Sequence, residues 1–168
     1  MKSKYYFLAL DNFNYDMSLC IENLEYALSY DSDDADTHCL LGRVYSEMLK
    51  DYNKAIECFE EALQIDVLNI NIYGHYINCL ILNEDYKVAE KAILFAKTIK
   101  GIDKANIFYL EAFLQERLGN YKKAVALLEE AKKHSFYKNV SDYVEEKRIL
   151  VKAKLPEKKS KKTKVVQS

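Results

Sequence analysis

Cysteine and histidine are the residues of this chain whose side chains could hold a metal ion. The four cysteines, Cys20, Cys39, Cys58 and Cys79, are nineteen to twenty-one residues apart, and the three histidines are scattered. A structural zinc site usually takes its ligands in closely spaced pairs, and the sequence contains no such pair. We therefore expect no metal site, and we expect small, reduced, buried thiols in a cytoplasmic protein.

Paired glutamates are a second candidate, because two neighbouring carboxyl groups can act as general acid and base. Glu60–Glu61 and Glu129–Glu130 are such pairs, but beside lysines on a helix they are better explained as a solvated face. The four glycines are at least eighteen residues apart, so no glycine-rich phosphate-binding loop can be written. Neither GxSxG nor HExxH occurs. The sequence predicts no enzyme and no cofactor.

The elements that position these side chains are indicated by small residues that return at intervals of 34 or 35 residues. A second small residue follows each of the first ones by seven residues, which is two helical turns and so the same helix face. A large apolar residue lies between the two. The first series is Cys20, Ala55, Ala89 and Ala124; the second is Ala27, Ala62, Ala96 and Ala131; the large residues are Leu24, Phe59, Ile93 and Leu128.

Each of these helices is predicted to begin at a short polar residue that can cap it, namely Asp16, Asp51, Asp85 and Asn120. The segments before them, 35–49, 70–83 and 105–118, have apolar residues at helical spacing and predict a partner helix. The unit is thus an antiparallel helix pair. One pair cannot bury its apolar faces alone, so the pairs are expected to stack.

The segments "LLGRVYSEMLKDYNKAIECFEEALQID" (40–66) and "YLEAFLQERLGNYKKAVALLEEAKK" (109–133) resemble the tetratricopeptide repeat. The middle unit departs from the repeat pattern by placing Ile77 where a small residue is usual. Val67 stands where the pattern has proline, and the turn before Asp51 looks one residue long. The matching residues are Leu41, Gly42, Tyr45, Ala55, Phe59 and Ala62, and then Ala112, Gly119, Tyr121, Ala124, Leu128 and Ala131.

The resemblance implies an all-α fold, a right-handed superhelix of stacked antiparallel helix pairs closed by a C-terminal capping helix. The folded domain is predicted over 1–155 and a basic disordered tail over 156–168. Within the domain we expect an abbreviated first pair at 3–31, repeats at 35–67, 70–101 and 105–135, and the capping helix at 140–155.

The resemblance also implies a function, because proteins of this family typically hold a peptide in a groove lined by the first helix of each pair. The subset that clamps a C-terminal carboxylate uses lysine and asparagine, and only Asn78 fits that pattern here. We therefore expect a ligand of mixed aromatic and polar character, bound by an adaptor or scaffold that is not an enzyme. The groove positions carried over are Cys39, Arg43, Glu47, Gly74, Asn78, Ile81, Tyr109, Phe113 and Glu116.

The C-terminal tail gives a rival function. Residues 152–168 contain seven lysines and one acid in a chain of net charge −1, so the rest of the chain is acidic. The tail is either a solubilising end or a weak contact for nucleic acid, which would make the chain an RNA- or ribosome-associated factor. No apolar run is long enough to span a membrane. The sequence leaves monomer and homodimer open. The tail lysines are Lys158, Lys159, Lys161, Lys162 and Lys164.

Overall fold

The computed structural model describes residues 2–156 and leaves residue 1 and residues 157–168 undescribed. Over the described residues the chain forms nine α-helices and one π-helical turn, without a strand. The helices are α1 (Lys4–Asn12), α2 (Met17–Tyr30), α3 (Ala35–Arg43), α4 (Tyr52–Ile65), α5 (Ile70–Leu82), α6 (Tyr86–Ala96), α7 (Lys104–Arg117), α8 (Tyr121–His134) and α9 (Lys138–Lys152), with the π turn η1 (Val44–Leu49) after α3.

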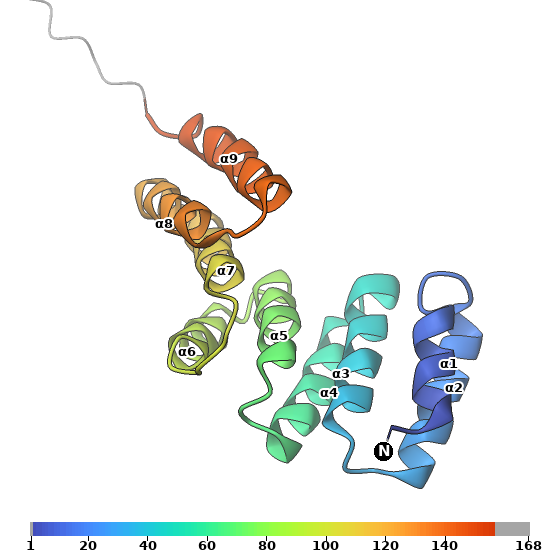
Figure 1. The fold of residues 1–168 in the computed structure, drawn as a ribbon. Helices are drawn as coiled ribbons and strands as arrows, with labels where there is room; N and C mark the ends of the chain where they lie inside the picture. Colours follow the sequence, from blue (N-terminus) through green and yellow to red (C-terminus); the bar gives the residue numbers. More distant parts are fainter. Residues whose placement is uncertain (1, 157–168) are drawn as a thin grey trace, which may run out of the picture.

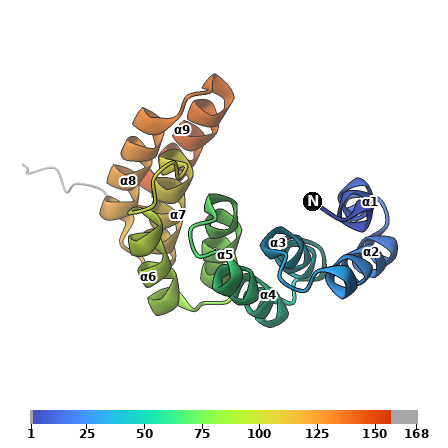
Figure 2. The same cartoon turned by 60° about the horizontal axis from the view of Figure 1, so that its bottom comes forward.

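The helices pack in consecutive pairs, and the pairs follow one another in a curved stack (Figure 1). Figure 2 shows α1, α3, α5 and α7 along the inner side of the bend and α2, α4, α6 and α8 along its outer side. The last helix, α9, packs on α8. The predicted all-α stack of antiparallel helix pairs is confirmed.

The small residues that repeat along the sequence are the points where helices meet. All eight residues of the two small series are buried, and seven of them have no exposed surface at all. The four large residues between them are at most 2% exposed. A small side chain lets a neighbouring helix approach closely, and the large residue beside it then fills the space between the two helices.

The core is divided into three clusters along the stack rather than gathered at one centre. The first joins α1 and α2 to α3 around Leu24 and Val44. The second spans α3 to α7 around Phe59 and Ile77. The third joins α7 and α8 to α9 around Leu128. Each cluster therefore depends on its neighbouring pairs only, as in other repeat arrays.

All four residues predicted to start a helix stand at the N-terminal end of one, but only two of them cap it with their side chains. The side chains of Asp16 and Asp51 accept hydrogen bonds from backbone N–H groups of their helices. Asp85 and Asn120 stand at the same position without capping. Their side chains bond elsewhere: the amide of Asn83 donates to Asp85 over 2.7 Å, and Asn120 donates to Gln115 over 3.0 Å.

A π turn lies within the 35-residue interval between Cys20 and Ala55, whereas the described helices of the other 35-residue interval, between Ala89 and Ala124, contain none. It widens the end of the helix, so that the N–H of Asp51 donates to the carbonyl of Tyr45, six residues back, over 2.9 Å. Lys50 then takes a left-handed conformation with φ of 56° to reverse the chain. The short turn expected before Asp51 is accommodated in this way.

Candidate functional site

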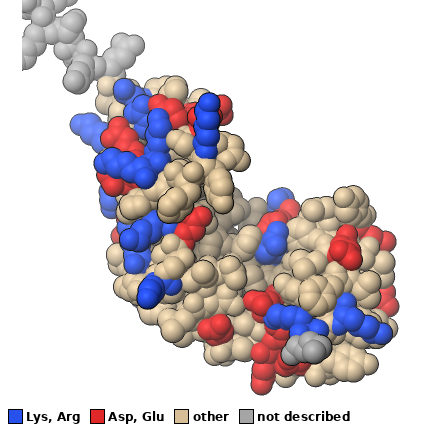
Figure 3. Space-filling view, in the orientation of Figure 1, with Lys and Arg blue, Asp and Glu red and all other residues tan. Residues whose placement is uncertain are grey.

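The inner side of the bend carries a pocket of about 190 Å³ between the first helices α1, α3 and α5. Lysine and arginine side chains gather over the arm formed by α7, α8 and α9, in the upper left of Figure 3. The surface is hollowed between this arm and the rest of the stack. The pocket is lined by Tyr6, Leu10, Asp36, Cys39, Leu40, Arg43, Asn71 and His75.

Two of the predicted groove residues, Arg43 and Glu47, are brought together one helical turn apart. The Nε of Arg43 donates to Oε1 of Glu47 over 2.9 Å, and the guanidinium lies 4.5 Å from the centre of the Phe13 ring. Nδ1 of His75, on the neighbouring first helix α5, lies 3.3 Å from the same carboxylate oxygen. This polar group joins α3 and the π turn to α5 beside the groove pocket.

Arg43 and His75 stabilise the negative charge of Glu47. Burial alone would raise the pKa of Glu47, but the hydrogen bonds from His75 and Arg43 outweigh burial and lower the pKa to about 2. Its side chain remains 39% exposed. Glu47 is thus a carboxylate at neutral pH, with one positive side chain already beside it.

The C-terminal half of the groove is aromatic. The hydroxyl groups of Tyr109 and Tyr143 lie 3.0 Å apart and their rings 5.6 Å apart. The ammonium group of Lys147 lies 5.9 Å from the centre of the Phe113 ring. Both contacts join α7 to α9. Tyr109 and Phe113 were predicted from the sequence, whereas Tyr143 and Lys147 were missed.

The signal that could have found Tyr143 and Lys147 is the repeat interval itself. Each stands 34 residues after its partner on α7, and α9 begins 34 residues after α7. The capping helix therefore occupies the place of a further first helix and extends the groove. Its exposed surface carries polar residues such as Asn139, Asp142 and Glu146 together with the apolar Ile149 and Leu150.

The family resemblance predicts that Glu116 binds a ligand, but its carboxylate is already paired with two lysines of this chain. The ammonium groups of Lys147 and Lys154 lie 2.8 Å and 2.7 Å from its carboxylate, and its side chain is 9% exposed. Burial tends to raise the pKa of Glu116, but the two lysines outweigh it and lower the pKa. Glu116 joins α7 to the end of α9.

The other predicted groove residues are buried or partly buried. Ile81 is fully buried and belongs to the core of the groove wall, whereas Cys39 is 7% exposed and contributes to the lining of the pocket. Gly74 lies under the side chain of Asn106, whose amide nitrogen would be 2.7 Å from an added Cβ atom. Asn78 is half-buried on α5. The tail lysines, Lys158, Lys159, Lys161, Lys162 and Lys164, lie outside the described residues.

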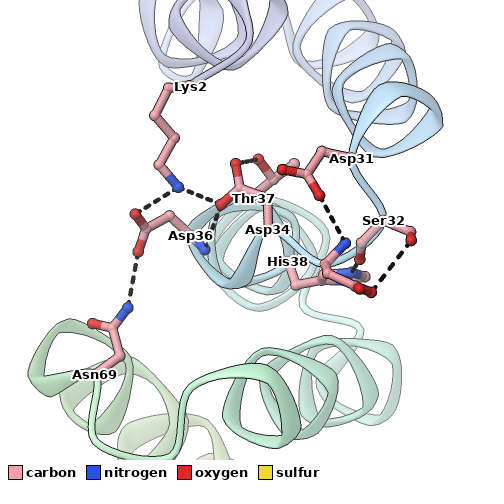
Figure 4. Close-up of polar contacts among 9 residues, drawn as sticks. Lys2, Asp31, Ser32, Asp34, Asp36, Thr37, His38 and Asn69 are labelled. Atoms are coloured by element: carbon pink, nitrogen blue, oxygen red, sulfur yellow. Dashed lines mark hydrogen bonds and ion pairs between the residues drawn. The ribbon is translucent and has the colours of Figure 1, made fainter.

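One polar cluster at the edge of the groove had no signal in the sequence. Lys2 reaches across to α3 and pairs with Asp34 and with Asp36, the second over 2.7 Å (Figure 4). Asn69 donates to the other oxygen of Asp36 over 3.0 Å. The cluster thereby joins three consecutive pairs of the stack. It depends on residues more than thirty positions apart, which no local pattern connects.

The thiols show no arrangement for chemistry within residues 2–156. All four are free and buried, and burial raises the pKa of Cys39, Cys58 and Cys79 to about 12. Such thiols stay protonated near neutral pH and are poor nucleophiles. In the same described range no three His, Cys, Asp or Glu side chains are placed to share a metal ion, and none of the helices is long and apolar enough to cross a membrane.

Comparison with known proteins gives one matching family model, the tetratricopeptide repeat, over residues 35–66. No curated protein matches the sequence. A crystal structure of a thermophilic tetratricopeptide-repeat protein from Thermus thermophilus superposes with a TM-score of 0.73 at 14% identity, covering 87% of this chain and 80% of that one.

Two further solved structures have the same fold. PilF of Pseudomonas aeruginosa gives a TM-score of 0.72 at 19% identity over 89% of this chain and 71% of that one. A crystal structure of MamA superposes with a TM-score of 0.65 at 16% identity, covering 89% of this chain and 87% of that one. These identities are low, so the likeness shows a shared architecture.

Proposed function

Because this chain carries a tetratricopeptide repeat at residues 35–66 and has the fold of tetratricopeptide-repeat proteins, we propose that it is an adaptor or scaffold that binds a peptide or protein in its concave groove. Proteins with this repeat generally act through protein–protein contacts and are generally non-catalytic. Four free thiols fit a reducing compartment, and we place the adaptor in the cytoplasm.

The observation that carries the proposal is the aromatic group of Tyr109, Phe113 and Tyr143 on the inner side of the stack. Aromatic side chains supply much of the binding energy at protein interfaces, since each buries a large area with little loss of conformational freedom. Tyr143 is 58% exposed, and the exposed Leu150 lies two turns further along α9. These exposed side chains offer apolar contact area to a ligand residue.

The N-terminal half of the groove offers a different chemistry. The pocket beside Arg43, Asn71 and His75 presents hydrogen-bond donors and acceptors, and Glu47 adds a carboxylate. An extended peptide that spans the groove would meet polar groups at α3 and α5 and aromatic rings at α7 and α9. The expected ligand therefore has a polar segment followed or preceded by an apolar or aromatic anchor.

Selection of peptides from a random display library on the full chain tests this function. We expect selected peptides to lose affinity by about tenfold or more with Phe113→Ser or Tyr143→Ser, because each removes an anchor contact, and to weaken with Arg43→Glu. Binding would be measured by fluorescence polarisation, with circular dichroism as a check on folding.

Tyr15→Ser is the matched control, since Tyr15 is 90% exposed at the α1–α2 turn and outside the groove. Peptides that bind all four variants with unchanged affinity would place the binding surface elsewhere. A library from which no peptide is enriched would contradict a peptide-binding groove.

A further inference from the structure

An exposed apolar patch lies on the edge of the stack where the second helices end. The connections α2–α3, α4–α5 and α6–α7 follow one another along the lower edge of the stack in Figure 1. At the α4–α5 connection the sequence is Ile65-Asp-Val-Leu-Asn-Ile70, and all four of its aliphatic side chains are exposed, Leu68 by 61%.

The patch continues from this connection to α6. The hydroxyl of Tyr73 donates to the carbonyl of Val67 over 2.7 Å, and the ring of Tyr73 lies 5.9 Å from that of Phe95. Tyr73 is buried, whereas Phe95 is 43% exposed. We call this surface the edge patch, and it consists of Ile65, Val67, Leu68, Ile70 and Phe95. Single exposed apolar residues are normal, but a contiguous group in a chain connection favours a covered surface.

The charges on the two sides of the edge patch have opposite sign. The α2–α3 connection carries the exposed Asp31 and Asp33 and no basic residue. The α6–α7 connection and the start of α7 carry the exposed Lys100 and Lys104, with Asp103 between them, while Lys97 beside them is paired with Glu111 of α7. The edge therefore runs from an acidic connection through a mainly apolar centre, in which Asp66 is the one charged residue, to a basic connection.

This order is self-complementary. When two copies meet edge to edge about a two-fold axis through the apolar centre, the acidic connection of each faces the basic connection of the other. Both charge contacts form at once, together with burial of both patches. An unrelated partner would need the same order of charges, whereas a second copy supplies it by symmetry.

We propose that the edge patch is the interface of a two-fold homodimer of this chain. The interface lies on the edge of the stack, and the first helices that line the groove lie on its inner side. Each copy therefore keeps an open groove, and the dimer presents two of them. The proposal does not depend on the function proposed for the groove.

Sedimentation equilibrium of the full chain tests the dimer. We expect the wild type to show twice the chain mass at micromolar concentration and Leu68→Glu to show the chain mass, because a buried unpaired carboxylate opposes association. Leu150→Glu is the matched control: Leu150 is 63% exposed on α9, away from the patch, and its variant is expected to remain a dimer. Circular dichroism of each variant would show that the fold is kept.

A charge exchange tests the symmetry. The pairs Asp31→Lys with Asp33→Lys, and Lys100→Glu with Lys104→Glu, each place like charges across both contacts, so each variant alone is expected to show the chain mass. Mixing the two restores attraction at both contacts, and the dimer mass should return.

Any of these outcomes would overturn the proposal: a wild type of single-chain mass at all concentrations, a dimer that survives Leu68→Glu, or a mixture of the two charge variants that stays monomeric. Dissociation by Leu150→Glu would move the interface to α9 and would also overturn it.

Discussion

The side chains of the groove act through partners that lie on neighbouring helices. Glu47 on the π turn is held by Arg43 one turn earlier and by His75 on α5. Glu116 on α7 is held by two lysines of the α9 region. Their positions within the repeat predicted both glutamates as groove residues. These positions gave no information on the partners of the glutamates, because the partners depend on how first helices from successive pairs pack.

Glu47 gives a prediction on pH dependence. A carboxyl group whose pKa is lower in the folded chain stabilises the fold above its unfolded pKa, and this contribution is lost as pH falls through the folded pKa. For Glu47 the loss falls between about pH 4.5 and about pH 2. We expect Glu47→Gln to lower the free energy of unfolding at pH 7 by less than about 1 kcal/mol, since the partly exposed ion pair is screened by solvent.

Urea unfolding at pH 7, 4.5 and 2.5 measures the difference in free energy of unfolding between the wild type and Glu47→Gln. This difference should shrink towards zero at the lowest pH. Glu57→Gln on the exposed face of α4 is the control, with no change expected at pH 7. A difference for Glu47→Gln that is the same at all three pH values would contradict the ion-pair role.

At the scale of the helix, a short polar residue marks each start, but its side chain can bond to another nearby side chain instead of capping. Asp16 and Asp51 cap their helices as the sequence predicts, whereas Asp85 and Asn120 bond to other side chains. The π turn could not be predicted either. Two of the three intervals are 35 residues long and the π turn occurs in one of them, so the interval length by itself does not indicate a π turn.

Asp51 gives a prediction for helix α4. Its side chain accepts a hydrogen bond from the backbone N–H of Lys54 over 3.2 Å. Removal by Asp51→Ala is expected to lower the free energy of unfolding by about 1 kcal/mol. Asp51→Asn keeps an acceptor at the same place and should cost less than Asp51→Ala. Urea unfolding of the three proteins measures this order, and an equal loss for both variants would assign the effect to the charge of Asp51 instead.

At the scale of the whole molecule the three-part core predicts local opening. Leu128 is buried in the cluster of α7, α8 and α9, which shares no buried residue with the cluster of α1 to α3. Leu128→Ala is expected to cost about 3 kcal/mol. Because clusters depend on adjacent pairs, the loss of stability should fall mainly on the C-terminal pairs.

Hydrogen exchange followed by mass spectrometry tests this expectation. In Leu128→Ala, protection should fall in α7, α8 and α9 and remain in α1 and α2. Leu24→Ala in the N-terminal cluster is the matched variant and should give the reverse pattern. Equal loss of protection along the whole chain in either variant would mean that the stack unfolds as one unit.

The sequence by itself determined the helix pairs, their period and their buried faces, because small and large apolar residues recur at helical spacing and burial of those residues stabilises the stack. The sequence also predicted Arg43, Tyr109 and Phe113 as groove residues. The 34-residue interval relates Tyr143 and Lys147 to Tyr109 and Phe113. Only the tertiary structure decided that these residues are in contact, that Ile81 is buried, and that Lys2 is held by Asp34 and Asp36. These contacts join residues about one repeat apart or more, and their geometry depends on how successive pairs are rotated, which a local pattern does not encode.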